Sequence, residues 1–477
     1  MWKYKNADEA KKHPFLRTLN NNIGRQTWEY DYDAGTVKER ADIEAIRKHF
    51  TANKDTQHHP SDAFMRYFNR EKSEEASKRF PLPDLKDKDG NLISFHDISK
   101  DPKLVEDHLK AGISFYKTLQ QDDGHWAGDY GGPMFLLPGL VIALYTTNGL
   151  SQIFTEQHIE ETVRYLRNHQ NPDGGFGLHI EGGSTMFGTG LSYVMARLLG
   201  VPAEDPMAVA ARTWIHRRGG ATFITSWGKF WLAVLGVYDW MGMNPLTPEM
   251  WLLPYSRWTG IGYLHPGRFW CHCRMVYLPM SYLYGKRTTC RETELTRQLR
   301  EELYPMPYNS IDWDRARNEC AKEDLFYPHP KIQDILWWSL LKCERFLMHS
   351  SLREKALKEC MKHIHYEDEN TRYVDIGPVN KVLNLLACWA EDPDSQAYRN
   401  HFARVSDYLW VAEDGLRMQG YNGSQLWDTA FAVQALAEAG LGRGLSSDPF
   451  GQNGAVGREG AKEADQESKE TSEGKRE

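Results

Sequence analysis

The stretch DDGHWAGDYGGPMFLLPGLVIALY, residues 122–145, decides the fold. It contains an Asp-Gly turn, a short connector of glycines and aromatic residues, and then a run of small and apolar residues. The same order returns in PDGGFGLHIEGGSTMFGTGLSYVMARLLG from Pro172 and in EDGLRMQGYNGSQLWDTAFAVQAL from Glu413. We expect each Asp-Gly turn to close one helix and each run to form the next. The three copies therefore indicate an internal repeat of a helix-loop-helix unit.

The segments around these connectors have the period of an α-helix. Apolar residues recur every three or four positions from Val105 to Leu119 and from Ile159 to Leu166, and the same period predicts a helix over 331–347. Alternating β-branched runs are scarce, so the predicted class is all-α. Repeated helix pairs of this kind stack into a ring, an α/α barrel with its loops gathered at one end.

The overall composition excludes some classes of function. The chain has 477 residues and a formal charge of −7, which gives no cationic surface for nucleic acid. Its seven cysteines are scattered and its first residues are charged, so we expect reduced thiols and no secretion signal. The longest apolar run, residues 135–145, is too short to cross a bilayer, so any membrane contact is expected from one side.

Two motifs have more than one interpretation. Cys271, His272 and Cys273 form a Cys-His-Cys run, but a lone CxC without a second ligand pair is weak evidence for zinc, and we predict no metal and no cofactor. Asp428 in QLWDTAF is either a catalytic acid or helix-start structure. An Asp near a helix N-terminus caps free amides and has a lowered pKa, which is the wrong direction for a proton donor.

Four blocks carry a family resemblance. They are KAGISFYKTLQQDDGHWAGDYGGPMFLLPGL (110–140), SWGKFWLAVLGVYDW (226–240), RFWCHCRMVYLPMSYLYG (268–285) and MQGYNGSQLWDTAFAVQAL (418–436). In the first block, Gln121, Gly124 and Trp126 form a Gln-x-x-Gly-x-Trp motif, whose amide and indole are expected to tie neighbouring helices together. In this order the blocks closely resemble the oxidosqualene cyclases, over about residues 20–440.

The resemblance implies a terpene cyclase fold of two α/α barrels, one inserted into the other, with the active cavity between them. The implied domains are a wrapping segment over 1–104, a complete inserted barrel over 105–372, the first helices of an incomplete catalytic barrel over 373–441, and a disordered polar tail over 442–477. The implied chemistry is the cyclisation of 2,3-oxidosqualene to a cycloartenol- or lanosterol-type product. A protonated Asp opens the epoxide, and aromatic faces stabilise the carbocations that follow.

The resemblance also assigns residues. Those matching the family's substrate-binding positions are Tyr130, Trp227, His272, Tyr421 and Trp427. Cys273 and Tyr277 match the substrate channel. Of Trp227 and Trp231, at most one is expected to face the cavity. Tyr421 matches the Tyr of cycloartenol-type members, whereas animal and fungal lanosterol-forming members have Thr there.

The match stops at about Gly440, where a tail of small and charged residues begins and disorder is expected from about residue 443. The family's Asp-Cys-Thr-Ala-Glu segment, which holds the catalytic acid, is absent. We therefore expect a C-terminally truncated chain with no catalytic residue of its own, inactive by itself, and with Asp428 as helix-start structure. The alternative is a remnant that binds a lipid or a protein partner without chemistry. A protein prenyltransferase subunit would need a zinc set of Asp, Cys and His that the sequence does not reveal.

Apolar and aromatic residues cluster with few charges at 246–258 and 275–284. These segments are either an interfacial patch or buried core. Because the resemblance is to a family bound to one side of the membrane, we expect membrane contact at the cytosolic surface of the endoplasmic reticulum or on lipid droplets.

Overall fold

The structure is a computed structural model that describes residues 1–6, 18, 22, 24–60, 63–70, 74, 78, 94–256, 262, 265–327, 329–420 and 425–439. The chain divides into two compact units, Met1–Gln425 and Leu426–Glu477. In the second unit the described element is α19 (Gln425–Glu438), whose first residue belongs to the first unit. The tail predicted to be disordered from residue 443 lies outside the described residues.

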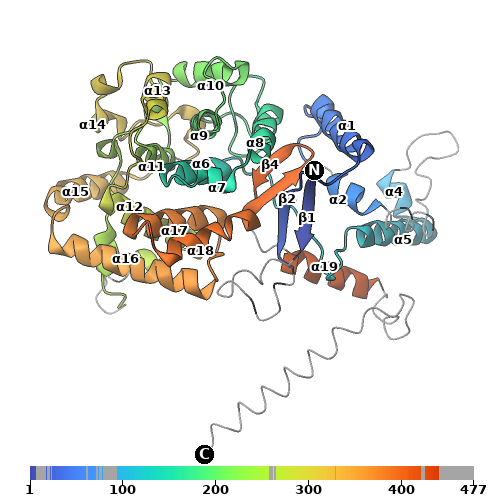
Figure 1. Cartoon of the computed structure of the whole chain (residues 1–477). Coiled ribbons are helices and arrows are strands. Elements are labelled where there is room, and N and C mark those ends of the chain that lie inside the picture. Colours follow the sequence, from blue (N-terminus) through green and yellow to red (C-terminus); the bar gives the residue numbers. More distant parts are fainter. Residues whose placement is uncertain are drawn as a thin grey trace, which may run out of the picture. The chain divides into compact units, whose positions relative to one another are not determined.

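Helices dominate the first unit (Figure 1), which confirms the predicted all-α class. In chain order they are α1 (Val37–Asn53), α2 (Ala63–Phe68), α4 (Phe95–Ile98), α5 (Pro102–Thr118), α6 (Leu136–Thr146), α7 (Leu150–Ile153), α8 (Glu156–His169), α9 (Met186–Leu198), α10 (Pro206–His216), α11 (Ser226–Leu235), α12 (Cys271–Lys286), α13 (Glu294–Glu302), α14 (Trp313–Ala316), α15 (Lys331–Leu347), α16 (Ser351–Asn370), α17 (Pro378–Glu391) and α18 (Gln396–Phe402). Among the described residues they do not close into a complete barrel, so the predicted domain limits remain predictions.

Two antiparallel hairpins accompany the helices. β1 (Trp2–Asn6) pairs with β2 (Gln26–Tyr30), and β3 (Leu409–Ala412) pairs with β4 (Gly415–Met418). β2 packs against β3. The Arg25 guanidinium, just before β2, pairs with the Asp407 carboxylate at 2.7 Å. The N-terminal segment thus lies against residues almost 400 positions later in the chain.

The repeated Asp-Gly turns have the expected backbone but not always the expected neighbours. Gly124, Gly174 and Gly415 have φ angles of 90°, 88° and 130°, a region that favours glycine. The first two turns follow α5 and α8, as predicted. The third joins β3 to β4, so the prediction that it closes a helix is wrong. The preceding residues, YLWVA, are aromatic and β-branched, which favours a strand.

The sequence periodicity predicted where the helices lie more accurately than it predicted which of their residues are buried. The predicted helices correspond to α5, α8 and α15. On α5, however, Val105 and Leu109 are exposed, and the buried positions include Ala111 and Ser114. In the Gln-x-x-Gly-x-Trp motif, the Trp126 ring stacks on Tyr116 at 5.5 Å and its indole donates to the Tyr116 carbonyl. The Gln121 amide donates to the carbonyl of Leu119, at the end of the same helix rather than on a neighbouring one.

The core around the site consists of α6, α9 and α11, which are almost wholly buried. α6 packs against α9, α11 and α17. The Thr185 hydroxyl caps α9 by accepting from the Gly188 amide at 2.9 Å, and α11 ends at Gly236 in the left-handed conformation. These signals fix where each helix begins or ends relative to its neighbours.

Of the two segments considered for membrane contact, 275–284 differs from α15 in how much apolar surface it exposes. The apolar side chains of 275–284 are mainly buried core, including Val276, Leu278, Met280 and Leu283. α15 instead exposes apolar side chains along one face, among them Ile332, Ile335 and Phe346, which is 83% exposed. No helix in the described part of the chain is both long and apolar enough to cross a bilayer.

Candidate functional site

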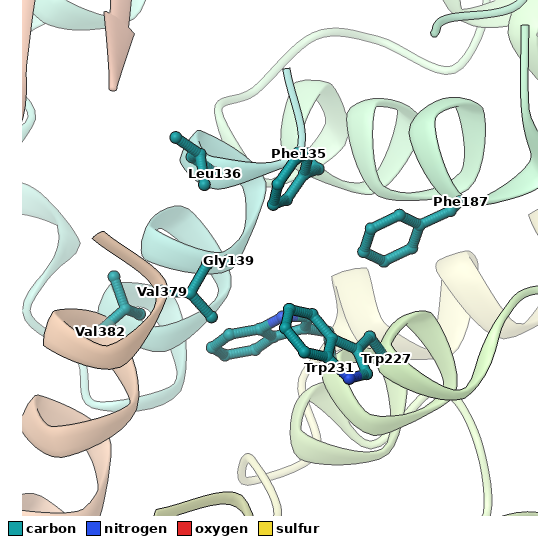
Figure 2. Close-up of a pocket in the computed structure, with 8 residues that line it drawn as sticks. All are labelled: Phe135, Leu136, Gly139, Phe187, Trp227, Trp231, Val379 and Val382. Carbon is teal, nitrogen blue, oxygen red and sulfur yellow. The ribbon is translucent and has the colours of Figure 1, made fainter. Parts of the chain in front are cut away.

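An aromatic pocket lies where α6, α9, α11 and α17 meet (Figure 2). The space in it that is wide enough for a water molecule is only about 10 Å³, so the lining side chains nearly fill the pocket. Its lining residues are aromatic, aliphatic or glycine: Phe135, Leu136, Gly139, Phe187, Trp227, Trp231, Val379 and Val382. Val379 and Val382 come from the segment predicted to begin the second barrel, and the others come from the segment predicted as the inserted barrel.

Two opposite parts of the wall are held by different means. The Trp231 ring is 4% exposed and lies against Gly139, where an added Cβ would come within 3.0 Å of the indole. Phe135 and Phe187 pack together with their ring centroids 6.0 Å apart. A larger residue at 139 would therefore press on the Trp231 indole, which would have to move by a few tenths of an ångström.

A distant carboxylate positions the start of α9. Asp324, at the end of the 3-10 helix η10 (Lys322–Asp324), accepts from the backbone amides of Met186 and Phe187 at 2.6 and 2.8 Å. Burial raises the pKa of Asp324, although these two hydrogen bonds oppose the rise. Phe187 is thus fixed in the pocket wall by a residue 137 positions later in the chain.

The two tryptophans of SWGKFW both line the pocket, and the expectation that at most one of them faces the substrate cavity stays a prediction. They are four residues apart in α11 and therefore share a face. Trp227 is half-buried, and its indole N–H donates to the Tyr277 hydroxyl of α12 at 3.2 Å. Two of the predicted residues are thereby in direct contact.

His272 and Cys273 lie in the first turn of α12 and are half-buried, but they are not among the pocket-lining residues. The His272 ring stacks on Trp270 at 4.8 Å, and its Nδ1 lies 3.2 Å from the Cys271 sulfur. The clusters of possible metal ligands among the described residues lie elsewhere and include none of these three.

The remaining predicted residues are Tyr130, Tyr421 and Trp427, with Asp428 beside the last of them. The Tyr130 ring is half exposed and packs on Gly420, whose amide donates to the Tyr130 carbonyl at 2.7 Å. Tyr421 lies outside the described residues. In the second unit, Trp427 is 67% exposed and Asp428 lies in the first turn of α19, which fits the expected helix-start position. The substrate roles of all these residues remain predictions.

A buried polar cluster lies on the face of α17 opposite the pocket, and sequence reasoning missed it. We call the residues Glu367, Asp368, Asp375, Lys381 and His401 the acidic cluster; all are buried. His401 Nε2 lies 3.2 Å from Asp368 Oδ2, and the Lys381 ammonium lies 2.8 Å from His401 Nδ1 and 3.8 Å from Asp375 Oδ2. Lys381 is thus the one ammonium among these five residues and pairs with Asp375, since burial and Lys381 hold the pKa of His401 well below its usual range.

This excess of acid raises the proton affinity of the cluster. Burial, with the neighbouring carboxylates, raises the pKa values of Glu367 and Asp375 to about 7. Asn380 and Asn384 each donate to Glu367 Oε2 at 3.0 Å, which partly offsets the effect. At neutral pH the cluster therefore holds a proton that free carboxyl groups would have lost.

Two donor sets with metal-ligand spacing include residues of the acidic cluster. His365, Asp368 and Cys388 form one group, and Asp368, Asp375 and His401 form the other. The Asp368 oxygens already accept from Asn384, Cys388 and His401, and Lys381 places a positive charge among the carboxylates. Most of these groups are hydrogen-bonded to one another, whereas Asp375 Oδ2 and Asn384 Oδ1 are buried without a hydrogen bond to the described residues. We interpret the cluster as structural. The sequence signal was the polar residues Asn380, Lys381 and Asn384 within the otherwise apolar VNKVLNLLAC.

Comparison with known proteins identifies the family of the chain. The family described as squalene-hopene cyclase N-terminal domain matches residues 109–414, more than half of the chain. This match defines an all-helical triterpene cyclase domain.

Three relatives specify the family further. The chain is 46% identical to alpha-onocerin synthase LCD of Lycopodium clavatum, over 92% of this chain and 57% of the relative. It is 49% identical to cycloartenol synthase of Dictyostelium discoideum, over 78% and 52%. It is 50% identical to lanosterol synthase of Mus musculus, over 72% and 46%. The chain belongs to the oxidosqualene cyclase family, and it spans about half the length of these curated relatives.

Proposed function

We propose that this chain supplies the aromatic wall of an oxidosqualene cyclase site and binds 2,3-oxidosqualene. The observation that carries the proposal is the pocket between α6, α9, α11 and α17, in a chain of this family. Four of its lining residues are aromatic, and none carries a nucleophile. Aromatic faces stabilise cations, and an apolar lining excludes the water that would quench them.

Acid-started cyclisation also needs a proton donor. No carboxyl group is among the described residues that line the pocket. We therefore propose that this polypeptide alone binds the substrate without cyclising it. A chain that binds a lipid or a protein partner with no part in cyclisation is the second candidate, and the exposed apolar face of α15 favours it.

The product type follows from one position. Tyr421 is the residue that the resemblance associates with cycloartenol-type members. Identity to the relatives does not decide between products, because the cycloartenol and lanosterol synthases are 49% and 50% identical to this chain. We propose a cycloartenol-type product for the enzyme to which this chain belongs.

Membrane contact is proposed through α15 rather than through residues 275–284. Ile332, Ile335 and Phe346 share the exposed apolar face of this helix, as interfacial binding requires. The proposed location is the cytosolic surface of the endoplasmic reticulum or a lipid droplet. Flotation with phosphatidylcholine vesicles tests it: Ile335→Glu should reduce recovery with the vesicles, and Val209→Glu, at an exposed position of α10, should not. Equal recovery of both variants would contradict the proposal.

Binding is tested by titrating the full chain, in detergent, with 2,3-oxidosqualene while tryptophan fluorescence is recorded. We expect saturable quenching that Trp231→Leu abolishes. Trp338→Phe, on the exposed face of α15, is the matched control and should preserve the binding curve. Quenching that is unchanged in Trp231→Leu would place the ligand elsewhere and favour the second candidate.

A further inference from the structure

The two tryptophans of the pocket differ in what holds them. Trp231 is buried and wedged against Gly139. Trp227 lies one turn earlier in α11 and is only half-buried, so packing restrains its ring less. Its orientation therefore depends more on polar contacts.

The polar contact of Trp227 is directional. An indole has a single donor, Nε1–H, and this donor points at the Tyr277 hydroxyl 3.2 Å away. The two rings meet edge to face, with centroids 6.0 Å apart and planes at 76°. The Nε1–H bond lies in the plane of the indole, so this hydrogen bond and the attachment through Cβ together restrict the orientation of that plane.

Tyr277 is itself supported from two sides. The Phe269 ring packs against it edge to face, with a centroid distance of 6.5 Å. Its backbone belongs to α12, which packs against α16 and α17. The Tyr277 hydroxyl is thus presented to Trp227 from a well-packed helix that does not itself line the pocket.

We propose that Tyr277 is a positioning residue: its hydroxyl holds the Trp227 indole in one orientation in the pocket wall. Attraction of a cation is strongest over the face of an indole, so the orientation determines how well a developing positive charge is stabilised. This inference rests on the proposed function for its consequence, but the hydrogen bond itself can be tested without activity.

The test labels the full chain with 5-fluorotryptophan and records ¹⁹F NMR spectra, with Trp227→Phe assigning the Trp227 signal. Tyr277→Phe, which removes only the hydroxyl, should shift that signal and broaden it. Tyr282→Phe is the matched control, since Tyr282 is a buried tyrosine of the same helix outside the pocket lining. It should leave the Trp227 signal unchanged.

Affinity supplies the second readout. The probe is a squalene-length tertiary amine, protonated at pH 7 as a mimic of a carbocation. We expect Tyr277→Phe to weaken its binding about three- to tenfold, the effect of one lost hydrogen bond. In the Trp227→Phe background the same change should have no effect, since the donor is gone.

A Trp227 signal unmoved by Tyr277→Phe, or additive losses of affinity, would overturn the proposal. If the unmodified chain does not bind the amine, the proposed function fails, and the Trp227 signal still decides the positioning role.

Discussion

The two faces of α17 contrast sharply. One face presents Val379 and Val382 to the aromatic pocket. The other presents Lys381 and Asn384 to the acidic cluster, where every side chain is buried and most are charged or hydrogen-bonded. One helix thus borders both a pocket suited to a hydrocarbon and a network that tolerates little change.

The two faces of α17 differ in the kind of contact that holds them. Apolar contacts on the pocket side are non-directional and can be exchanged at modest cost. Hydrogen bonds in the acidic cluster are directional and lie in a low-dielectric environment, so losing a partner leaves an unsatisfied charge. We therefore expect the acidic cluster to fix α17 and the pocket face to determine what binds.

The largest effect is expected for Lys381→Met. It removes the single ammonium among the three carboxylates of the acidic cluster while keeping the side-chain length. Removing one partner of a buried ion pair typically costs about 3–5 kcal/mol. Urea unfolding should show this loss, whereas Lys358→Met, at an exposed position of α16, should change the free energy of unfolding by less than about 0.5 kcal/mol. Similar changes in the free energy of unfolding for both variants would contradict the proposed difference between the two faces of α17.

Glu367 should make the free energy of unfolding depend on pH. Its pKa is about 7 in the folded chain and about 4.3 in an unfolded one. Between these values the folded state binds more protons, so the free energy of unfolding falls as pH rises from about 4.3 to about 7. The side chain of Glu367→Gln cannot ionise. The free energy of unfolding of this variant, relative to that of the original chain, should therefore be about 1–3 kcal/mol higher at pH 8 than at pH 5. Urea unfolding at the two pH values measures this, and parallel profiles would refute it.

A smaller effect is expected for Asp324→Asn. The amide keeps the shape but can accept only one of the two hydrogen bonds from Met186 and Phe187, and its NH₂ group faces the other amide. The expected cost is about 1–2 kcal/mol in thermal or urea unfolding. Asp314→Asn, whose side chain is 74% exposed, should cost less than about 0.5 kcal/mol. An equal cost at both sites would mean that Asp324 does not hold α9.

The smallest effect on stability is expected on the pocket face. Val379→Ala removes two methyl groups from a half-buried position, and the expected cost is about 0.5–1 kcal/mol. Its effect on ligand affinity should nevertheless exceed that of Glu367→Gln, because Val379 lines the pocket and Glu367 does not. Fluorescence titration of both variants decides which face governs binding.

Sequence periodicity predicted the helices because their apolar spacing is local information. The limits predicted for 331–347 coincide with α15, and the turn glycines Gly124 and Gly174 have the left-handed backbone that their place after a helix suggested. The hairpin at Gly415 was missed, because a strand pair is stabilised by a partner that the local pattern does not identify.

The site was predictable only in part, for a related reason. Trp227 was recognised, and Trp231 four residues later follows from the geometry of one helix face. Phe187 and its support Asp324 are 137 residues apart, and the acidic cluster joins residues from α16, α17 and α18. Such contacts depend on the packing of helices, which no spacing within one segment reveals.

The most direct test is to incubate the purified 477-residue chain with 2,3-oxidosqualene and to examine the extract by gas chromatography and mass spectrometry. The account predicts that the substrate is recovered uncyclised after binding, because the described pocket lining offers aromatic faces but no acid. A tetracyclic product formed by this polypeptide alone would contradict it.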